Sequence, residues 1–216
     1  MSLNKPSEIV FRYFPELLLD ERKEKVEAAF QLYKTWNDKI NVISRKDIDG
    51  FYEKHFLHAL AIAKFIQFRP DTKVLDVGTG GGFPGIPLAI IFPDVHFHLV
   101  DSIAKKISVV HDVAHALDLR NVKAECTRSE SLGEKYDFIT SRAVAPASDL
   151  VYWNEKNISK LNRNQKLNGF LFLKGGDLSE EINLPGYKGS VIDIRDFFDE
   201  PFFAEEKKLV YLTNFS

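Results

Sequence analysis

Residues 73–85 have the sequence Lys73-Val-Leu-Asp-Val-Gly78-Thr-Gly80-Gly-Gly82-Phe-Pro-Gly85. An apolar run typical of a buried β-strand passes here into a glycine-rich turn and then into the start of a helix. Glycines at such a turn let the backbone approach a ligand without steric clash from a Cβ atom. The stretch therefore predicts a ligand cradle at the carboxyl end of a strand.

Short β-rich runs alternate with helical patterns after this stretch, which is typical of βαβ units and a parallel sheet. The runs that predict strands are 73–77, 95–100, 122–126, 136–141, 169–174, 190–194 and 208–213. The patterns that predict helices lie near 86–91, 104–117, 148–161 and 179–182. This order predicts an α/β fold with a mostly parallel, doubly wound sheet and an antiparallel edge strand.

The N-terminal part has a different pattern, with apolar residues at three- and four-residue steps. It predicts one amphipathic helix over 21–40, with Asp20 as its N-cap, and a second helix over 51–68. Arg69, Pro70 and Asp71 interrupt the pattern. We therefore expect a helical extension of residues 1–68 followed by the ligand-binding domain of residues 69–216.

Composition limits the class of protein. The formal net charge of −2 argues against binding nucleic acid by overall charge, so any contact with a polyanion needs a local basic patch. Cys126 is the single cysteine, so the chain forms no internal disulfide. The first residues lack the pattern of a signal peptide, and no apolar run approaches the roughly 20 residues of a membrane span. We expect a cytoplasmic protein.

Three groups of basic residues are candidate phosphate contacts, although each group also fits an ordinary solvated surface. They are Lys34, Lys39, Arg45 and Lys46; Lys105 and Lys106; and Lys156, Lys160, Arg163 and Lys166.

Two classes of adenosine-containing cofactor fit the glycine turn. Asp101 ends the next predicted strand, where a carboxylate can accept hydrogen bonds from both hydroxyls of a ribose. Gly80, Gly82 and Gly85 satisfy the dinucleotide pattern G-x-G-x-x-G, so an NAD-dependent oxidoreductase stays an alternative. The other class is S-adenosylmethionine.

Three details favour S-adenosylmethionine. The glycines begin early, at Gly78, and Asp76 precedes them by two residues. Pro84 and Pro87 crowd the helix start, where a pyrophosphate needs free N–H groups that proline lacks. Asp76 would repel a pyrophosphate but could hold the methionyl ammonium, directly or through water.

The segment Ser141-Arg142-Ala143 follows the fourth strand, where this architecture places groups that face the substrate. Arg142 could bind a phosphate, a base edge or the cofactor carboxylate, and an ordinary surface arginine is the alternative. The chain lacks both the Asn/Asp-Pro-Pro-aromatic motif of amino methylation and a Pro-Cys nucleophile. We therefore expect a substrate atom that is already nucleophilic, such as a ring nitrogen, with catalysis by alignment and without a general base.

Histidine pairs at 55 and 58 and at 111 and 115 have spacings that could place two metal ligands on one helix face. No third ligand accompanies either pair, so we expect no metal site.

The chain resembles the bacterial small-subunit ribosomal RNA guanine-N7 methyltransferases, the family long called glucose-inhibited division protein B. The resemblance covers nearly the whole chain. The segments that carry it are Asn41-Val-Ile-Ser-Arg45, His55-Phe-Leu-His-Ala-Leu60, the stretch from Asp76 through Phe83-Pro-Gly-Ile-Pro87 to Ala89, Val100-Asp-Ser-Ile-Ala-Lys-Lys106, Ser141-Arg-Ala143 and Leu173-Lys-Gly175.

The resemblance implies a Rossmann-like class I S-adenosylmethionine-dependent methyltransferase that modifies N7 of a guanine in 16S ribosomal RNA. It further implies that Gly78 to Gly82 and Phe83 hold the methionine half of the cofactor, Asp101 the ribose, Ser129 and Glu130 the adenine, and that Arg142 lines the site. Gly81 and the pair Thr127-Arg128 depart from the usual family sequence.

The expected partner is 16S ribosomal RNA or the small ribosomal subunit, and we expect a monomer. A non-catalytic ribosome-binding module with the same fold is a further alternative.

Overall fold

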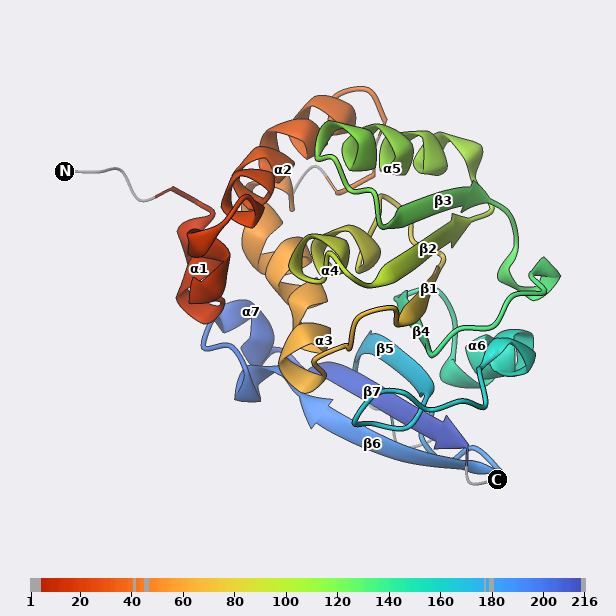
Figure 1. The fold of residues 1–216 in the computed structure, drawn as a ribbon. Coiled ribbons are helices and arrows are strands. Elements are labelled where there is room, and N and C mark those ends of the chain that lie inside the picture. Colours follow the sequence, from red (N-terminus) through yellow and green to blue (C-terminus); the bar gives the residue numbers. More distant parts are fainter. Residues whose placement is uncertain (1–4, 41, 45–46, 177, 179–180, 215–216) are drawn as a thin grey trace.

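The computed structural model describes residues 5–40, 42–44, 47–176, 178 and 181–214. Within these residues the chain forms one seven-stranded sheet with helices on both faces (Figure 1). The strands are β1 (Lys73–Val77), β2 (His96–Asp101), β3 (Val122–Cys126), β4 (Phe138–Arg142), β5 (Gly169–Gly175), β6 (Tyr187–Asp193) and β7 (Lys207–Asn214).

The helices fall into longer α-helices and short turns of other types. The α-helices are α1 (Glu8–Tyr13), α2 (Arg22–Asn37), α3 (His58–Phe65), α4 (Gly85–Ile91), α5 (Ala104–Ala116), α6 (Ala147–Asn154) and α7 (Pro201–Ala204). The 3-10 helices are η1 (Pro15–Leu19), η2 (Ile48–Gly50), η4 (Ser129–Ser131), η5 (Glu155–Asn157) and η6 (Ile194–Asp196), and η3 (Phe51–Leu57) is a π-helix.

The strand order is β3-β2-β1-β4-β5-β7-β6. Strands β1 to β5 pair in parallel, whereas β7 runs antiparallel between β5 and the edge strand β6. The predicted doubly wound sheet with an antiparallel strand near its edge is therefore confirmed. The strand order reverses between β1 and β4, and in open α/β sheets ligands bind at the carboxyl ends of the strands beside such a reversal.

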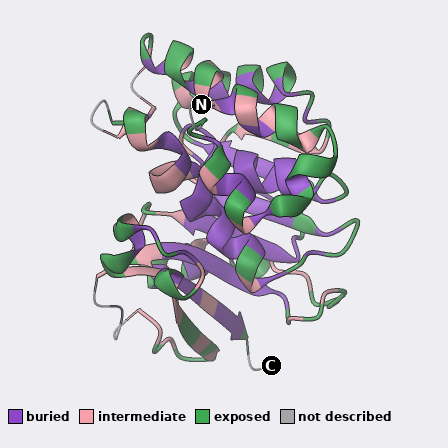
Figure 2. Ribbon diagram, turned by 90° about the vertical axis from the view of Figure 1, so that its left-hand side faces the viewer, coloured by how far each residue is buried: buried purple, intermediate pink, exposed green. Residues whose placement is uncertain are grey.

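Alternate side chains of each strand enter two apolar cores, one on each face of the sheet. Val74 faces a core shared with α2, α3, α4 and α5, whereas Leu75 and Val77 face a smaller core shared with α6. Figure 2 shows the buried sheet and inner helix surfaces between exposed outer helix faces. The two cores fix the sheet and thereby the positions at which its strands end.

The N-terminal helices pack directly on the sheet. Val10, Tyr33 and Leu60 belong to the same core cluster as Phe97 and Leu99 of β2. The division of the chain at residue 68 stays a prediction, and the apolar core is continuous across it. The carboxylate of Asp20 accepts the backbone N–H of Arg22 at 2.9 Å, so this residue does cap the first turn of α2. It lies one position before the residue that flanks the helix.

Two predicted helices differ from the structure. The helix expected over 148–161 is wrong in its second half, because α6 ends at Asn154 and Ile158 instead pairs with Tyr136 in an extended bridge. The helix expected over 51–68 begins as the π-helix η3, and its α-helical part ends at Phe65 because Ile66 is extended.

Some expectations fall outside the described residues, namely the basic side chains Arg45 and Lys46 and part of the helix-like segment near 179–182. Among the residues that the structure describes, no helix is both long and apolar enough to cross a membrane. The same residues contain no group of three or more His, Cys, Asp or Glu side chains arranged to hold a metal ion.

Candidate active site

A cavity of about 500 Å³ opens at the carboxyl ends of β1, β2 and β4, where the strand order reverses. Its volume lies within the range of roughly 300–1,000 Å³ that is usual for small-molecule sites. Seven of the predicted site residues line it: Gly78, Gly80, Phe83, Asp101, Ser129, Glu130 and Arg142. Two other predicted site residues, Asp76 and Gly82, are not part of the lining.

The buried carboxylate of Asp76 organises the glycine turn from behind. It accepts hydrogen bonds from the Thr79 hydroxyl at 2.7 Å, the Gly85 N–H at 3.0 Å and the Thr140 hydroxyl at 3.1 Å. Burial raises the pKa of Asp76 to about 6, while these three donors and the charge of Arg142 act in the opposite direction. Asp76 thus joins β1, the turn and β4 into one unit.

Several backbone N–H groups of the turn are already used within the protein. Gly80 N–H donates to Asp101 at 3.0 Å, and Gly82 and Phe83 N–H both donate to the Thr79 carbonyl at 2.9 Å. Gly85 N–H is bound by Asp76. A pyrophosphate depends on free N–H groups at this position, so the geometry disfavours the dinucleotide alternative.

Two glycines are needed for different physical reasons. Gly80 has φ +60°, a conformation that side chains rarely adopt, and no atom lies closer than 4.0 Å to the place of its missing Cβ. Gly82 has φ +102°, and a Cβ there would lie 2.6 Å from Ile86 and 2.9 Å from the Tyr33 hydroxyl. Gly80 therefore keeps the cavity side of the turn open, whereas Gly82 permits packing against the protein.

Tyr33 of α2 supports the turn, and the sequence indicated it only as one member of an apolar helix stripe. Its buried hydroxyl donates to the Gly81 carbonyl at 2.7 Å, and its ring lies 4.9 Å from the Phe83 ring. Burial raises the pKa of Tyr33, so the hydroxyl stays protonated as a donor. The N-terminal helices thus help to shape the cavity.

Asp101 is held at the cavity wall by local hydrogen bonds. One carboxylate oxygen accepts from Gly80 N–H at 3.0 Å, and the other accepts from Ile103 N–H at 2.9 Å. Lys106 lies 3.6 Å from the carboxylate. Since a carboxylate has about four acceptor positions, each oxygen of Asp101 keeps capacity for a further donor, such as a ribose hydroxyl.

Arg142 bounds the cavity on the side of β4. Its guanidinium lies over the Phe83 ring, with Cζ 4.9 Å from the ring centroid. Burial lowers the pKa of Arg142 to about 10, although the nearby charge of Asp76 opposes this shift. Among the described residues the guanidinium has neither a hydrogen bond nor an ion pair. An enclosed cation without a partner is suited to an anionic ligand group.

The turn after β4 is held in place by Lys174. Ala143 has φ +54°, and this turn brings Val144 over Gly78. Lys174 donates to the Ala145 carbonyl at 2.5 Å and pairs with Glu181 at 2.6 Å. These contacts position the segment that carries Arg142.

The sequence did not single out several other residues that line the cavity, which are Val42, Ile103, Val144 and Trp153. Ile103 follows Asp101 by two residues and is 47% exposed, which is unusual for isoleucine in a core of this size. Exposure is visible only in the structure, so the sequence offered no signal that Ile103 lies at the cavity. Val42, Val144 and Trp153 come from loops or helices that pattern analysis cannot place near the turn.

Comparison with known proteins assigns the family. The family model GidB, described as rRNA small subunit methyltransferase G, matches residues 22–196. A ribosomal RNA small subunit methyltransferase G of Bacteroides thetaiotaomicron is 52% identical, over 94% of this chain and 98% of that protein. One from Flavobacterium psychrophilum is 53% identical, over 95% of this chain and 97% of that protein.

Solved structures agree with the fold. A mutant of MtNAS in complex with S-adenosylmethionine aligns with a TM-score of 0.59 and 14% identity, over 98% of this chain and 89% of that chain. An rRNA methylase from Streptococcus thermophilus aligns with a TM-score of 0.51 and 11% identity, over 74% of this chain and 95% of that chain. At these identities the likeness concerns the fold alone. The family match and the relatives with about half of their residues identical show that the chain belongs to the rRNA small subunit methyltransferase G family.

Proposed function

We propose that this protein transfers the methyl group of S-adenosylmethionine to N7 of a guanine in 16S ribosomal RNA. The observation that carries the proposal is the cavity between Asp101 and Arg142, bordered by a glycine turn in which the N–H groups of Gly80 and Gly85 are bound by carboxylates of the protein. Family membership supports a ribosomal RNA substrate. The choice of guanine N7 rests on the resemblance of the sequence motifs.

The lining residues fit the methyl donor. Asp101 would accept the ribose hydroxyls, and Ile103 with Ser129 and Glu130 would surround the adenine. Gly78, Gly80 and Phe83 would border the methionine portion, while Asp76 and Gly82 shape the turn behind it. The bound donor supplies a methyl group on a positively charged sulfur, and the chemistry needs only a correctly placed nucleophile.

Arg142 fits the carboxylate of the donor better than it fits the target base. The N7 lone pair must be free to attack, so a bidentate arginine contact to N7 and O6 of the guanine would block the reaction. Methylation also places positive charge on the guanine, which an adjacent free guanidinium would oppose. Pairing Arg142 with a carboxylate removes both problems and satisfies the buried cation.

The protein contributes alignment and needs no general base. Guanine N7 carries no proton, so none has to be removed in the attack. Fixing the nucleophile in line with the methyl group supplies the rate enhancement through orientation. The apolar rim formed by Val42, Val144 and Trp153 would exclude water from the reacting atoms.

One basic patch lies on the cavity side of the molecule. Lys106 and Arg128 line the cavity, and Lys105 precedes Lys106 in the first turn of α5. The group around Lys160, Arg163 and Lys166 precedes β5, at the end of the strands opposite the cavity, and Arg163 lies 3.6 Å from Asp137 just ahead of β4. We therefore assign phosphate contacts to Lys105, Lys106 and Arg128, with binding that weakens steeply as salt rises.

The protein would act in the cytoplasm, where small ribosomal subunits are present, and as a monomer. Light scattering during size-exclusion chromatography tests the monomer.

Calorimetric titration with S-adenosylmethionine and with NAD tests the cofactor, followed by a methylation assay with unmodified small subunits. The proposal expects binding of S-adenosylmethionine alone and transfer of label to RNA. Binding of NAD alone would favour the oxidoreductase. A ribosome-binding module would bind subunits without transferring label.

A further inference from the structure

Three side chains from distant parts of the chain meet behind the cavity. The His55 ring lies 5.6 Å from the Phe83 ring, and the Arg142 guanidinium lies over the same Phe83 ring at 4.9 Å. His55 comes from η3, Phe83 from the glycine turn and Arg142 from the end of β4. Phe83 and Arg142 line the cavity, and His55 lies directly behind this lining, against the Phe83 ring.

The imidazole of His55 lacks hydrogen-bond partners. Both of its ring nitrogens are buried, and neither bonds to any other group among the residues that the structure describes. A neutral imidazole carries one donor and one acceptor, and buried polar groups of folded proteins are almost always paired. Two unmatched nitrogens beside a ligand cavity point to a partner that arrives with the substrate.

His55 is also held in its uncharged form. Burial lowers the pKa of His55 to about 4, and the charges of Arg142 and Lys54 act in the same direction, while Asp47 opposes them. At neutral pH the ring is therefore an uncharged hydrogen-bonding group. Such a group tolerates a base that becomes positively charged, which a histidinium would repel.

The backbone around His55 is unusual in a way that fits a functional position. Residues Phe51–Leu57 form a π-helix that passes into the α-helix α3. π-helical turns are rare and occur frequently at functional sites. The wider turn sets the direction of His55 relative to Phe83, which a continuous α-helix would not reproduce.

We propose that His55 is a specificity-determining residue that accepts a hydrogen bond from N1–H of the target guanine. This inference rests on the proposed methylation of guanine. Adenine has no hydrogen at N1, so a buried acceptor at this place discriminates against it. As N7 gains the methyl group, positive charge spreads over the purine and N1–H becomes a stronger donor. The contact therefore strengthens in the transition state and acts on kcat as well as on KM.

The experiment is a cycle of enzyme and substrate changes. A 16S RNA is assembled by ligation with either guanosine or 2-aminopurine riboside at the target position, and 2-aminopurine keeps N7 but lacks N1–H and the O6 oxygen. Wild type, His55→Phe and His55→Gln are compared by kcat/KM on both RNAs. Differences in N7 reactivity and in contacts that do not involve His55 are the same for all enzymes, so they cancel in the ratio. A third RNA with 6-thioguanosine keeps N1–H but has a weaker acceptor at position 6, so an unchanged effect of His55→Phe on it assigns the contact to N1–H and not to O6.

We expect His55→Phe to lower kcat/KM on guanosine by about tenfold, the usual effect of one hydrogen bond. On 2-aminopurine it should lower kcat/KM little, so the preference for guanosine falls by about the same factor. His55→Gln should restore part of that preference, because its amide oxygen is also an acceptor. The affinity for S-adenosylmethionine, measured by calorimetry, should stay unchanged.

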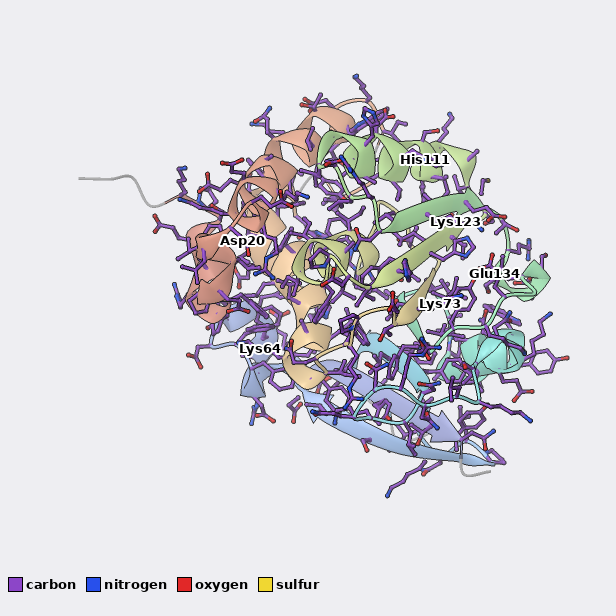
Figure 3. The ribbon with its side chains drawn as sticks, in the orientation of Figure 1. Asp20, Lys64, Lys73, His111, Lys123 and Glu134 are labelled. Carbon is purple, nitrogen blue, oxygen red and sulfur yellow. The ribbon has the colours of Figure 1, made fainter. Side chains whose placement is uncertain are left out.

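The matched control is His111→Phe on the exposed face of α5, labelled in Figure 3. It should change neither rate. An equal preference for guanosine in wild type and in both His55 variants would overturn the inference while leaving the proposed function intact. Weaker binding of S-adenosylmethionine by His55→Phe would also overturn the inference. A wild-type enzyme that does not methylate the guanosine RNA would contradict the proposed function itself, and the inference would fail with it.

Discussion

The hydroxyl of Tyr33 on α2 donates a hydrogen bond of 2.7 Å to the carbonyl oxygen of Gly81 in the glycine turn. This bond connects the N-terminal helices directly to the wall of the cavity. A buried carbonyl that loses its donor is left unpaired, which lowers stability by about 1–3 kcal/mol.

Tyr33→Phe should therefore reduce the free energy of unfolding by this amount and weaken binding of S-adenosylmethionine. Urea denaturation and calorimetric titration measure the two effects. Tyr152→Phe is the control, because Tyr152 is 78% exposed, and it should change neither quantity. If Tyr33→Phe changed neither the stability nor the affinity for S-adenosylmethionine, a supporting role for this hydrogen bond would be refuted.

Asp101→Ala should weaken binding of S-adenosylmethionine by about 100-fold or more. The change removes charged acceptors for the ribose hydroxyls, and each such hydrogen bond is worth about 1.5–3 kcal/mol. It also frees the N–H groups of Gly80 and Ile103. Asp112→Ala is the matched control, since Asp112 is exposed on α5 and forms no hydrogen bond or ion pair with the other described residues. Calorimetric affinity equal to that of wild type would exclude Asp101 from the site.

Arg142→Met should separate binding from stability. The guanidinium forms no hydrogen bond or ion pair among the described residues, and its charge favours the ionised form of the buried Asp76 carboxylate. We expect only a small loss of stability in urea denaturation, because Asp76 keeps its three hydrogen-bond donors, together with binding of S-adenosylmethionine weakened by about 10- to 100-fold, as for the loss of a charge-assisted pair. Arg142→Lys keeps the charge but not the bidentate geometry and should fall between the two.

If Arg142→Met instead lost much of its stability but bound S-adenosylmethionine as tightly as wild type, Arg142 would be a structural residue.

His58 should make stability depend on pH. Burial lowers the pKa of His58 to about 3, and the charge of Arg142 adds to this shift. Between about pH 6.5 and pH 3 the unfolded chain binds a proton that the folded protein does not bind. Stability is therefore present above pH 6.5 and falls as the pH is lowered, by about 1.4 kcal/mol per pH unit for this one group.

His58→Met removes the contribution of His58 to this pH dependence. Its free energy of unfolding should therefore fall less steeply than that of wild type as the pH is lowered from about 6 to about 4.5. The raised pKa of Asp76 has the opposite sign but contributes equally to both proteins. Urea denaturation at a series of pH values measures the two slopes. If the free energy of unfolding fell equally steeply with pH in both proteins, His58 would take up a proton in the folded state as readily as in the unfolded chain.

Much of the fold could be predicted because strand patterns depend on local sequence. The β-rich runs at 73–77 and 122–126 coincide with β1 and β3. The cavity lining could be predicted in part, since the carboxyl ends of β1 and β2 are adjacent in any such sheet and bring Gly80 and Asp101 together.

The remaining features depend on packing between distant segments. Nothing local distinguishes Tyr33, which supports the turn, from the other apolar residues of its helix. The π-helix η3 is set by its contacts with the core and has no sequence pattern of its own. The inward direction of Asp76 follows from donors supplied by Thr140 on another strand. The early end of α6 follows from the pairing of Ile158 with Tyr136.

The central claim is methyl transfer to guanine N7, and one measurement tests it most directly. Unmodified small ribosomal subunits are incubated with the protein and S-adenosylmethionine labelled in its methyl group, and the RNA is then cleaved chemically at N7-methylguanine. We expect label at a single guanine of 16S ribosomal RNA, coincident with the cleavage, and much less label with Asp101→Ala at a concentration of S-adenosylmethionine that saturates only the wild type. Label on another base, on another atom of guanine or on ribosomal protein would contradict it.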